Sequence, residues 1–551
     1  MVNAILSGLL SCTLINAVYS SSPRQVKDSP VVDLGYAQYR GVYDTNMNVT
    51  NYRGVRYAAS PTGDLRWRAP QAPKNIPGIQ QANTDPPSCF QAPNGGGVFR
   101  VQPEAETEDC LFVNIASPGA EVPSQGLSVV VWIHGGGYVL GNASQFQASD
   151  LMQDSRNSVV SVVIQYRLGL FGFLAGSEVK EKGVLNAGLL DQKFALRWVQ
   201  ENISKFGGDP TKVTIWGQSA GGGSVLQHVI AEDGRTSPKL FKAAITSSTY
   251  LPPQYRYDDD IPEHITLHRV YIEKFSLRQS KEIQFEGSFD FSDSFFGCSS
   301  SSDTVACLRA TDTELLASAN VNINSAGFFG TYVFVPVVDG TFITRRPIEA
   351  LKQRKLNTDV MLAVANTNEG VIYVNQTAPA NVGRYARDLF PTFGSEQADV
   401  VVQLYKGLGT ELDQVNLVMG EAIFICPTYF VTRAFKDRAF KGQFAVPPAL
   451  HGDDVVYYFP TLALVSPANF NNSDFQKAFS ESFLSFVVHQ DPNARLDPTS
   501  ILPQWNTSDG GQVEMVFNRT NDAPDLHSAS MDQALLERCS FWESVAALTG
   551  Q

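Results

Sequence analysis

The chain of 551 residues alternates short apolar runs with helical patterns, and this alternation restricts its fold more than any other feature. A helical pattern occupies residues 188–203, and a second one starts near Ser219. Five apolar runs have the composition of buried strands: residues 128–133, 158–166, 212–216, 243–246 and 359–365. Strands that alternate with helices predict βαβ units and a large, mostly parallel sheet flanked by helices. We therefore expect an α/β fold.

The length alone would suggest three or four domains. However, the sequence shows no linker rich in Pro, Ser or Gly, no long charge run and no repeat of fixed period. Residues 251–325 are polar and irregular, as expected of a long insertion over the carboxyl edge of the sheet. We predict one large domain over residues 21–551.

The first twenty residues have the character of a signal peptide. Residues 4–18 are mostly apolar but too short to cross a bilayer, and small residues follow them. The alternative is a buried N-terminal helix, which the polar, Pro-containing sequence that follows does not favour. No later segment is expected to insert into a membrane. Seven Asn-x-Ser/Thr sites agree with secretion: Asn48, Asn142, Asn202, Asn375, Asn471, Asn506 and Asn518.

The formal net charge of −13 argues against a nucleic acid as partner, because an acidic protein repels phosphate backbones. The six cysteines after Cys12 are even in number and belong to a chain predicted to enter an oxidising compartment. They predict three disulfides, with 15 possible pairings. Metal binding is the alternative, but no Cys-x-x-Cys pair supports it, and we expect no metal.

The pentapeptide Gly217-Gln218-Ser219-Ala220-Gly221 lies directly between a predicted strand and a predicted helix. A serine on such a tight turn presents its hydroxyl outward, and the flanking glycines let strand and helix approach closely. The same pattern alone also fits a Gly-rich turn or a helix-capping serine. Its position, outside the carboxyl end of a strand where ligands bind in such sheets, favours Ser219 as a nucleophile.

A second glycine motif, His134-Gly135-Gly136-Gly137, follows the run 128–133. Attack on an ester carbonyl creates a negatively charged oxygen that needs fixed N–H donors, and glycines leave the backbone free to aim them. A flexible turn and a nucleotide-binding loop are the alternatives, but no GxGxxG or Walker pattern is present. We assign the N–H groups of Gly136, Gly137 and Ala220 as donors of an oxyanion hole.

A serine nucleophile needs a histidine base that a carboxylate orients. Of the seven histidines, His451 lies in a loop between apolar segments, whereas His228 falls in the helix after the nucleophile. The carboxylate is expected after a late strand, where Glu369 follows the run 359–365. Asp339 and Asp453 are the rival acids.

Together these motifs resemble the type-B carboxylesterase family, which includes cholinesterases and certain secreted lipases. The most specific block runs from Asn186 to Val199 and through Phe206-Gly-Gly-Asp-Pro210 to Gly221, and the resemblance covers nearly the whole mature chain. It implies an α/β-hydrolase fold, ester hydrolysis and a triad of Ser219, Glu369 and His451.

The resemblance also implies three disulfides, Cys89–Cys110, Cys298–Cys307 and Cys426–Cys539. It implies two ion pairs, Arg66 with Glu108 and Arg167 with Asp191. It further implies that Ser247 supports the triad from behind.

Three features depart from the best-known relatives. The Cys89–Cys110 loop holds no Trp for a quaternary ammonium, which argues against choline specificity. It is also too short for a large oil-sensing lid. Gly330 and Tyr332 align with the acyl pocket, and a glycine at 330 predicts room for a longer or bulkier acyl group.

We therefore expect a secreted serine hydrolase that needs no cofactor and acts on a small-molecule ester. An interfacial triacylglycerol or sterol-ester lipase is one alternative. An adhesion or binding protein on the same fold is another, although such relatives lack part of the triad. The sequence does not indicate an oligomeric state.

Overall fold

The computed structural model describes residues 29–97, 99, 105–264, 298, 301–508 and 512–551. A central 11-stranded sheet has the order β14-β13-β12-β11-β10-β9-β7-β8-β6-β4-β3, and β1, β2 and β5 form a small second sheet. The strands are β1 Val31–Asp33, β2 Gln38–Arg40, β3 Val42–Asp44, β4 Val49–Arg56, β5 Ile79–Gln81, β6 Phe112–Pro118, β7 Leu127–Ile133, β8 Val159–Ile164, β9 Gly208–Gln218, β10 Ala243–Ser247, β11 Val360–Asn366, β12 Ala439–Phe444, β13 Val513–Thr520 and β14 Ala523–Ser530.

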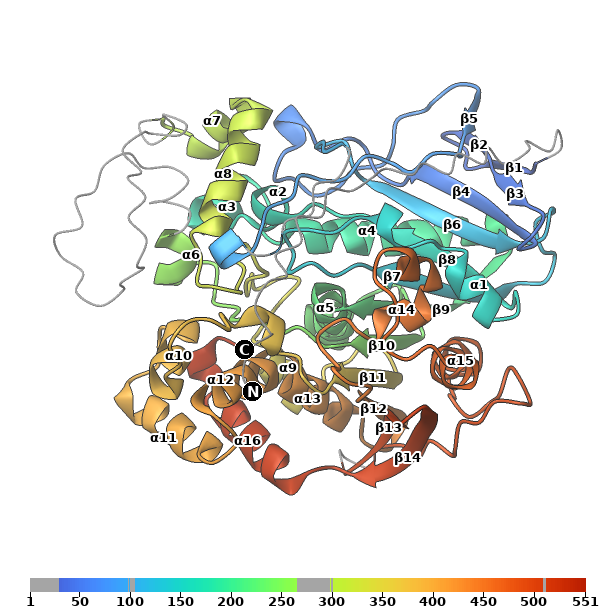
Figure 1. Cartoon of the computed structure of the whole chain (residues 1–551). Coiled ribbons are helices and arrows are strands. Elements are labelled where there is room, and N and C mark those ends of the chain that lie inside the picture. Colours follow the sequence, from blue (N-terminus) through green and yellow to red (C-terminus); the bar gives the residue numbers. More distant parts are fainter. Residues whose placement is uncertain (1–28, 98, 100–104, 265–297, 299–300, 509–511) are drawn as a thin grey trace, which may run out of the picture.

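Helices flank this sheet on both sides (Figure 1). They are α1 Asp150–Asp154, α2 Gly169–Phe173, α3 Ser177–Lys182, α4 Ala187–Asn202, α5 Ala220–Gly234, α6 Asp260–His264, α7 Thr304–Ala310, α8 Thr313–Ser325, α9 Pro347–Lys352, α10 Val382–Leu389, α11 Ser395–Tyr405, α12 Glu411–Gly420, α13 Cys426–Phe435, α14 Val455–Tyr458, α15 Ser473–His489, α16 Gln533–Ser544 and α17 Ala546–Thr549.

The predicted α/β architecture is confirmed. From β13 to β8 the neighbouring strands are all parallel, whereas β14 at one end and β6, β4 and β3 at the other pair antiparallel. All five predicted strands exist, as β7 to β11. One boundary differs, because β9 begins at Gly208, before the predicted run 212–216.

Two apolar clusters lie on opposite faces of the sheet, and β7 shows how. Val129, Val131 and Ile133 belong to one cluster, whereas Val130 and Trp132 belong to the other. Successive side chains of a strand point to opposite faces, so β7 is apolar throughout because both of its faces are covered. Residues of α4, α5 and α13 complete the first cluster, and residues of α1, α14 and α15 complete the second.

One later segment does meet the length and hydropathy of a membrane span, contrary to the sequence-based expectation. The helical stretch Glu411–Arg438 has a mean hydropathy of 1.4 over its most apolar window. That window is 83% buried inside the protein. Its apolar character is therefore explained by packing in the core.

Three disulfides are present, Cys89–Cys110, Cys298–Cys307 and Cys426–Cys539, and they are the pairs that the resemblance implies. The predicted signal peptide, residues 1–20, lies outside the described residues. Of the predicted insertion 251–325, the described parts include α6, α7 and α8.

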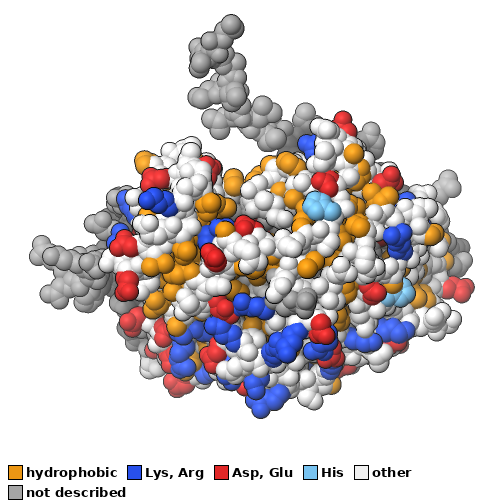
Figure 2. Space-filling view, turned by 90° about the horizontal axis from the view of Figure 1, so that it is seen from below, with side chains coloured by type: hydrophobic (Ala, Val, Ile, Leu, Met, Phe, Trp, Pro, Cys, Tyr) orange, Lys and Arg blue, Asp and Glu red, His pale blue; other side chains and the backbone are white. Residues whose placement is uncertain are grey.

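The face drawn in Figure 2 carries many basic side chains along one side, with Asp and Glu among them. Ion pairs also join acidic and basic side chains on the surface of the protein. Asp359 pairs with both Lys239 and Arg438, and Glu543 pairs with both Lys352 and Arg433. Mixed charges of this kind keep a surface soluble without creating a single-sign field.

Candidate active site

Ser219 sits on a sharp turn between β9 and α5. Its φ of 57° and ψ of −124° are unusual for a residue with a side chain, so the surrounding structure must hold them. The Ser219 N–H donates to Ser247 O at 2.9 Å, and the Gly223 N–H donates to Ser219 O at 2.8 Å. These bonds fix the turn and leave the hydroxyl at the carboxyl edge of the sheet.

The two outer glycines of the pentapeptide are required by close backbone contacts. A Cβ on Gly217 would lie 2.4 Å from the backbone of Gly221, and a Cβ on Gly221 would lie 1.9 Å from Ile133 O. A side chain at Gly217 would push β9 away from α5, and a side chain at Gly221 would push α5 away from β7. The glycines therefore serve strand–helix packing, as the motif predicts.

The glycine loop after β7 passes directly beside the nucleophile. A Cβ on Gly135 would lie 2.9 Å from the Cβ of Ser219. Gly136 and Gly137 have φ values of 103° and 61°, which favour glycine. Within the described residues, the N–H groups of Gly136, Gly137 and Ala220 donate to no backbone acceptor. Three free donors next to Ser219 have the chemistry of an oxyanion hole.

His134 is a structural part of this loop. Burial lowers its pKa to about 4, so the ring is neutral near pH 7. The ring stacks on Tyr166 with centroids 4.5 Å apart, and the Tyr166 hydroxyl donates to His134 O at 2.8 Å. His134 thus anchors the loop to the core and does not face the nucleophile as a base.

Glu369 and His451 form a direct hydrogen bond. Glu369 follows β11, His451 follows β12, and the distance from His451 Nδ1 to Glu369 Oε2 is 2.5 Å. Glu369 is fully buried, and its Oε1 accepts the Asn366 N–H at 2.7 Å. Because a carboxylate accepts, Nδ1 carries the proton of the neutral ring, which leaves Nε2 free to accept another.

The Nε2 atom of His451 contacts Gln218, the residue before the nucleophile. The distance from Gln218 Nε2 to His451 Nε2 is 3.2 Å. Within the described residues, no hydrogen bond joins the Ser219 hydroxyl to this ring. Burial raises the pKa of Tyr373, and a hydrogen bond with the Ser219 side chain opposes this rise. Ser219 and His451 therefore each contact another side chain, Tyr373 and Gln218 respectively.

The rival acids serve other purposes. Asp453 Oδ2 accepts the Leu450 N–H at 2.8 Å and so braces the His451 loop. Asp339 accepts the side-chain amide of Asn186 at 2.6 Å and backbone N–H groups of its own turn. His228 lies in α5, as expected, where it is buried, and burial lowers its pKa to about 3.

A second buried carboxylate, Asp454, lies behind the pair, and the sequence analysis missed it. The side-chain amide of Asn366 donates to Asp454 Oδ1 at 2.9 Å and to Ser248 Oγ at 3.1 Å. The Tyr458 hydroxyl donates to Asp454 Oδ2 at 3.1 Å. Burial raises the pKa of Asp454 to about 6. The adjacent Asp453-Asp454 pair was the available signal, but sequence alone does not show which aspartate turns inward.

Ser247 contacts Ser219 through its backbone carbonyl. Its carbonyl accepts the Ser219 N–H, whereas its hydroxyl accepts from Trp216 Nε1 at 3.2 Å and lies 3.5 Å from the Tyr458 hydroxyl. Ser247 therefore stands behind the nucleophile and connects it to the network of Tyr458 and Asp454.

Two tyrosines form walls beside the nucleophile. The Tyr332 ring lies against the oxyanion loop, because a Cβ on Gly137 would come within 2.3 Å of it. The Tyr373 ring lies 5.2 Å from the His451 ring, a contact that no local sequence pattern indicates. Phe424 packs 4.5 Å from the same imidazole. The base is thus enclosed by aromatic side chains.

The backbone of Tyr373 lies directly against Gly330. A Cβ at this position would lie 1.9 Å from Tyr373 O, so the space beside Gly330 is filled by backbone. Its φ of 78° also favours glycine. Gly330 thus permits the close approach of Tyr373, and its predicted place in an acyl pocket stays a prediction.

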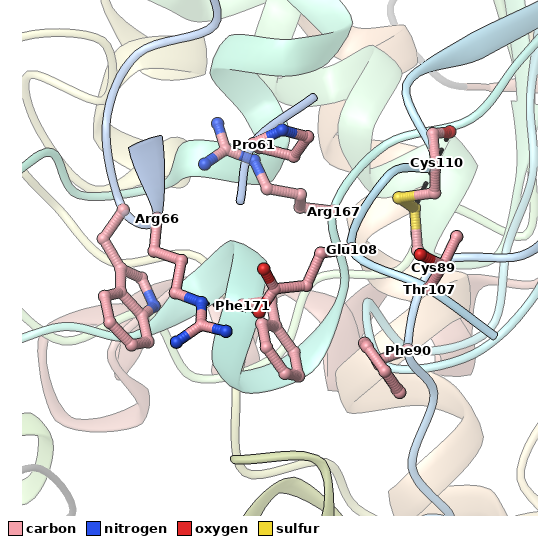
Figure 3. A pocket seen from close by; sticks show the side chains of 10 residues that line it. Pro61, Arg66, Cys89, Phe90, Thr107, Glu108, Cys110, Arg167 and Phe171 are labelled. Carbon is pink, nitrogen blue, oxygen red and sulfur yellow. Dashed lines mark hydrogen bonds and ion pairs between the residues drawn. A yellow bond between two sulfur atoms is a disulfide. The ribbon is translucent and has the colours of Figure 1, made fainter. Parts of the chain in front are cut away.

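The two implied ion pairs are present under the Cys89–Cys110 loop. Arg66 Nε lies 2.6 Å from Glu108 Oε1, and Arg167 Nη2 lies 2.7 Å from Asp191 Oδ1. Figure 3 shows Arg66, Glu108 and Arg167 around one small pocket, with the disulfide at its side. Within the described part of the chain, no group of three or more His, Cys, Asp or Glu side chains is arranged to hold a metal ion.

The chain is similar to known proteins over nearly its whole length. The model of the carboxylesterase family matches residues 28–542. The chain is 28% identical to "Carboxylesterase 1E" of Mus musculus, over 91% of this chain and 92% of that protein. It is 26% identical to "Secreted lipase" of Arthroderma benhamiae, over 99% and 97% of the two chains.

Among solved structures, EstA of Aspergillus niger resembles it with a TM-score of 0.80 and 27% identity, over 95% of this chain and 99% of that one. A family match over nearly the whole chain, on an α/β-hydrolase sheet, identifies the class of reaction. The chain belongs to the carboxylesterase family and is a carboxylic-ester hydrolase.

Proposed function

We propose that the chain hydrolyses esters through a triad of Ser219, Glu369 and His451, with an acyl-enzyme intermediate. The observation that carries this proposal is the 2.5 Å hydrogen bond from His451 Nδ1 to Glu369 Oε2, next to a serine on a strained strand–helix turn. A neutral histidine with its Nδ1 proton on a carboxylate presents Nε2 as a general base.

In the first half-reaction, Ser219 Oγ attacks the ester carbonyl while its proton passes to His451 Nε2. The buried Glu369 carboxylate stabilises the imidazolium that forms. The carbonyl oxygen becomes an oxyanion and accepts from the N–H groups of Gly136, Gly137 and Ala220. The alcohol leaves with the proton of His451.

In the second half-reaction, water attacks the acyl-enzyme. His451 removes a proton from this water, and the same three N–H groups hold the new oxyanion. The carboxylic acid leaves as Ser219 regains its proton. Each half-reaction thus begins and ends with a neutral imidazole, and no cofactor enters the balance.

The test of the triad uses Ser219→Ala together with Ser144→Ala, a control on a partly buried serine outside the site. We expect Ser219→Ala to lose at least a thousandfold in kcat/KM for a p-nitrophenyl ester, and the control to keep its activity. A fluorophosphonate should label the wild-type chain on Ser219 and leave Ser219→Ala unlabelled. A fully active Ser219→Ala variant contradicts the proposal, and a wild-type chain with neither adduct nor turnover favours a binding protein.

We further propose a substrate of small or medium size in preference to an oil droplet. The Cys89–Cys110 disulfide closes a segment with a sequence separation of only 21 residues, which leaves little chain for a large lid. A series of p-nitrophenyl esters from C2 to C16, with and without an emulsion, tests this. We expect the highest kcat/KM below about C8 and no activation by the interface. Activation only above the solubility limit would instead indicate a lipase.

We also propose that the chain is secreted and that its mature part is one domain. Residues 1–20 are a signal peptide, and residues 21–551 form one α/β-hydrolase domain. Three disulfides and a relative named a secreted lipase support an extracellular location. Asn48, Asn471 and Asn506 are exposed and suited to glycosylation, whereas Asn142 and Asn202 are buried.

A further inference from the structure

Gln218 lies beside His451 Nε2, the atom that the Ser219 hydroxyl must reach in the proposed mechanism. It is the last residue of β9, its exposed fraction is 8%, and its side-chain nitrogen lies 3.2 Å from His451 Nε2. The Nδ1 proton of the neutral ring faces Glu369, so Nε2 holds a lone pair. An amide NH2 donates into such a lone pair but repels the N–H of an imidazolium.

The side chain of Gln218 passes between two loops. A Cβ on Gly135 would lie 3.0 Å from Gln218 Oε1, and a Cβ on Gly452 would lie 3.8 Å from Gln218 Nε2. The side chain therefore extends between the oxyanion loop and the loop of His451. Its oxygen is on the side of Gly135, and its nitrogen is on the side of the base.

The other polar groups around the ring are carboxyl groups and one phenol. Glu369 bonds Nδ1 directly, and the Asp453 and Asp454 carboxyls interact electrostatically with His451. The remaining titratable neighbour is Tyr373, whose ring lies 5.2 Å away and whose hydroxyl bonds Ser219. Among the described side chains that hydrogen-bond to the imidazole, Gln218 is the one whose contact favours the neutral ring.

We propose that Gln218 is a positioning residue that holds His451 in its neutral, proton-accepting form between turnovers. It releases Nε2 to the Ser219 hydroxyl when an ester binds. This inference rests on the proposed triad. The contact between Gln218 and His451 should extend activity to a lower pH than a carboxylate at position 218 would allow, and this difference can be measured.

The test is the pH dependence of kcat/KM on a soluble p-nitrophenyl ester. Gln218→Glu places a carboxylate beside Nε2, which stabilises the imidazolium. We expect the acid limb of the profile to move up by about one pH unit, which is about a tenfold loss on that limb. Gln218→Met removes the donor without adding charge, and we expect a smaller shift in the same direction.

The matched control is Gln512→Glu. Gln512 is exposed and directly precedes β13. Because β13 is parallel to β12, Gln512 lies at the amino edge of the sheet, whereas the site lies at the carboxyl edge. We expect its acid limb to coincide with that of the wild type. Titration with a fluorophosphonate gives the concentration of competent sites for each variant, so misfolded protein does not enter the comparison.

Failure of this inference and failure of the triad give different results. If Ser219→Ala is inactive but Gln218→Glu keeps the wild-type acid limb, the role of Gln218 is overturned and the triad stands. If Gln218→Glu does not fold, an unshifted limb in Gln218→Met overturns the role equally. If Ser219→Ala is active, the triad itself fails.

Discussion

At the scale of single residues, Gly137 carries two constraints at once. Its φ is 61°, and a Cβ would come within 2.3 Å of the Tyr332 ring. We expect Gly137→Ala to displace the Gly137 N–H and to lower kcat by about a hundredfold or more, the loss typical of one oxyanion donor. Steady-state kinetics on a p-nitrophenyl ester measure this, and KM should change much less.

Gly407→Ala is the control for backbone strain. Gly407 has a φ of 84°, but a Cβ there would meet nothing within 4 Å. This variant should lose about 1 kcal/mol of stability and keep its kcat. Equal activity of both variants would show that Gly137 supplies no donor.

At the scale of elements, several carboxyl groups are buried where α15 packs against α1. Glu481 of α15 is 8% exposed, and its Oε2 has no hydrogen-bond partner among the described residues. Burial and the nearby Asp497 raise its pKa to about 7. Asp154 of α1 accepts from Ser480 at 2.5 Å, and burial raises its pKa too.

The sign of the pH effect follows from this raised pKa. The folded protein holds the Glu481 proton more tightly than the unfolded chain, so this contribution to stability is complete below about pH 4.5 and is lost as pH rises through 7. We expect Glu481→Gln to gain about 1–2 kcal/mol over the wild type at pH 8 relative to pH 5. Urea unfolding at both pH values measures it, with exposed Glu537→Gln as control. A difference independent of pH would contradict this reasoning.

The same scale shows what the sequence could and could not predict. The strands β7 to β11 were visible because both of their faces are covered, which leaves runs such as Val129–Ile133 without polar interruption. Ser219 and the glycines of both loops were visible because their roles are local. The contact of Gln218 with His451 spans 233 residues, and that of Gly330 with the Tyr373 carbonyl depends on how two loops meet. Such contacts are set by tertiary packing, which no local pattern reports.

At the scale of the whole molecule, the three disulfides close loops of very different size. Their sequence separations are 113 residues for Cys426–Cys539, 21 for Cys89–Cys110 and 9 for Cys298–Cys307. In the chain-entropy model, their removal costs about 4.8, 3.3 and 2.6 kcal/mol respectively. We expect the paired Cys→Ser variants to lose thermal stability in that order, as measured by calorimetry. The reverse order would show that local packing outweighs loop closure.

Ser219, Glu369 and His451 follow three different strands, β9, β11 and β12, and the acid and base alone are 82 residues apart in the chain. The contact between Glu369 and His451 cannot form within a local segment, so β9, β10, β11 and β12 must all be in register before the three side chains come together. Pairing over such separations is slow compared with helix formation. During refolding, far-ultraviolet dichroism should therefore recover first and esterase turnover last, which makes turnover a direct report on completed assembly of the sheet.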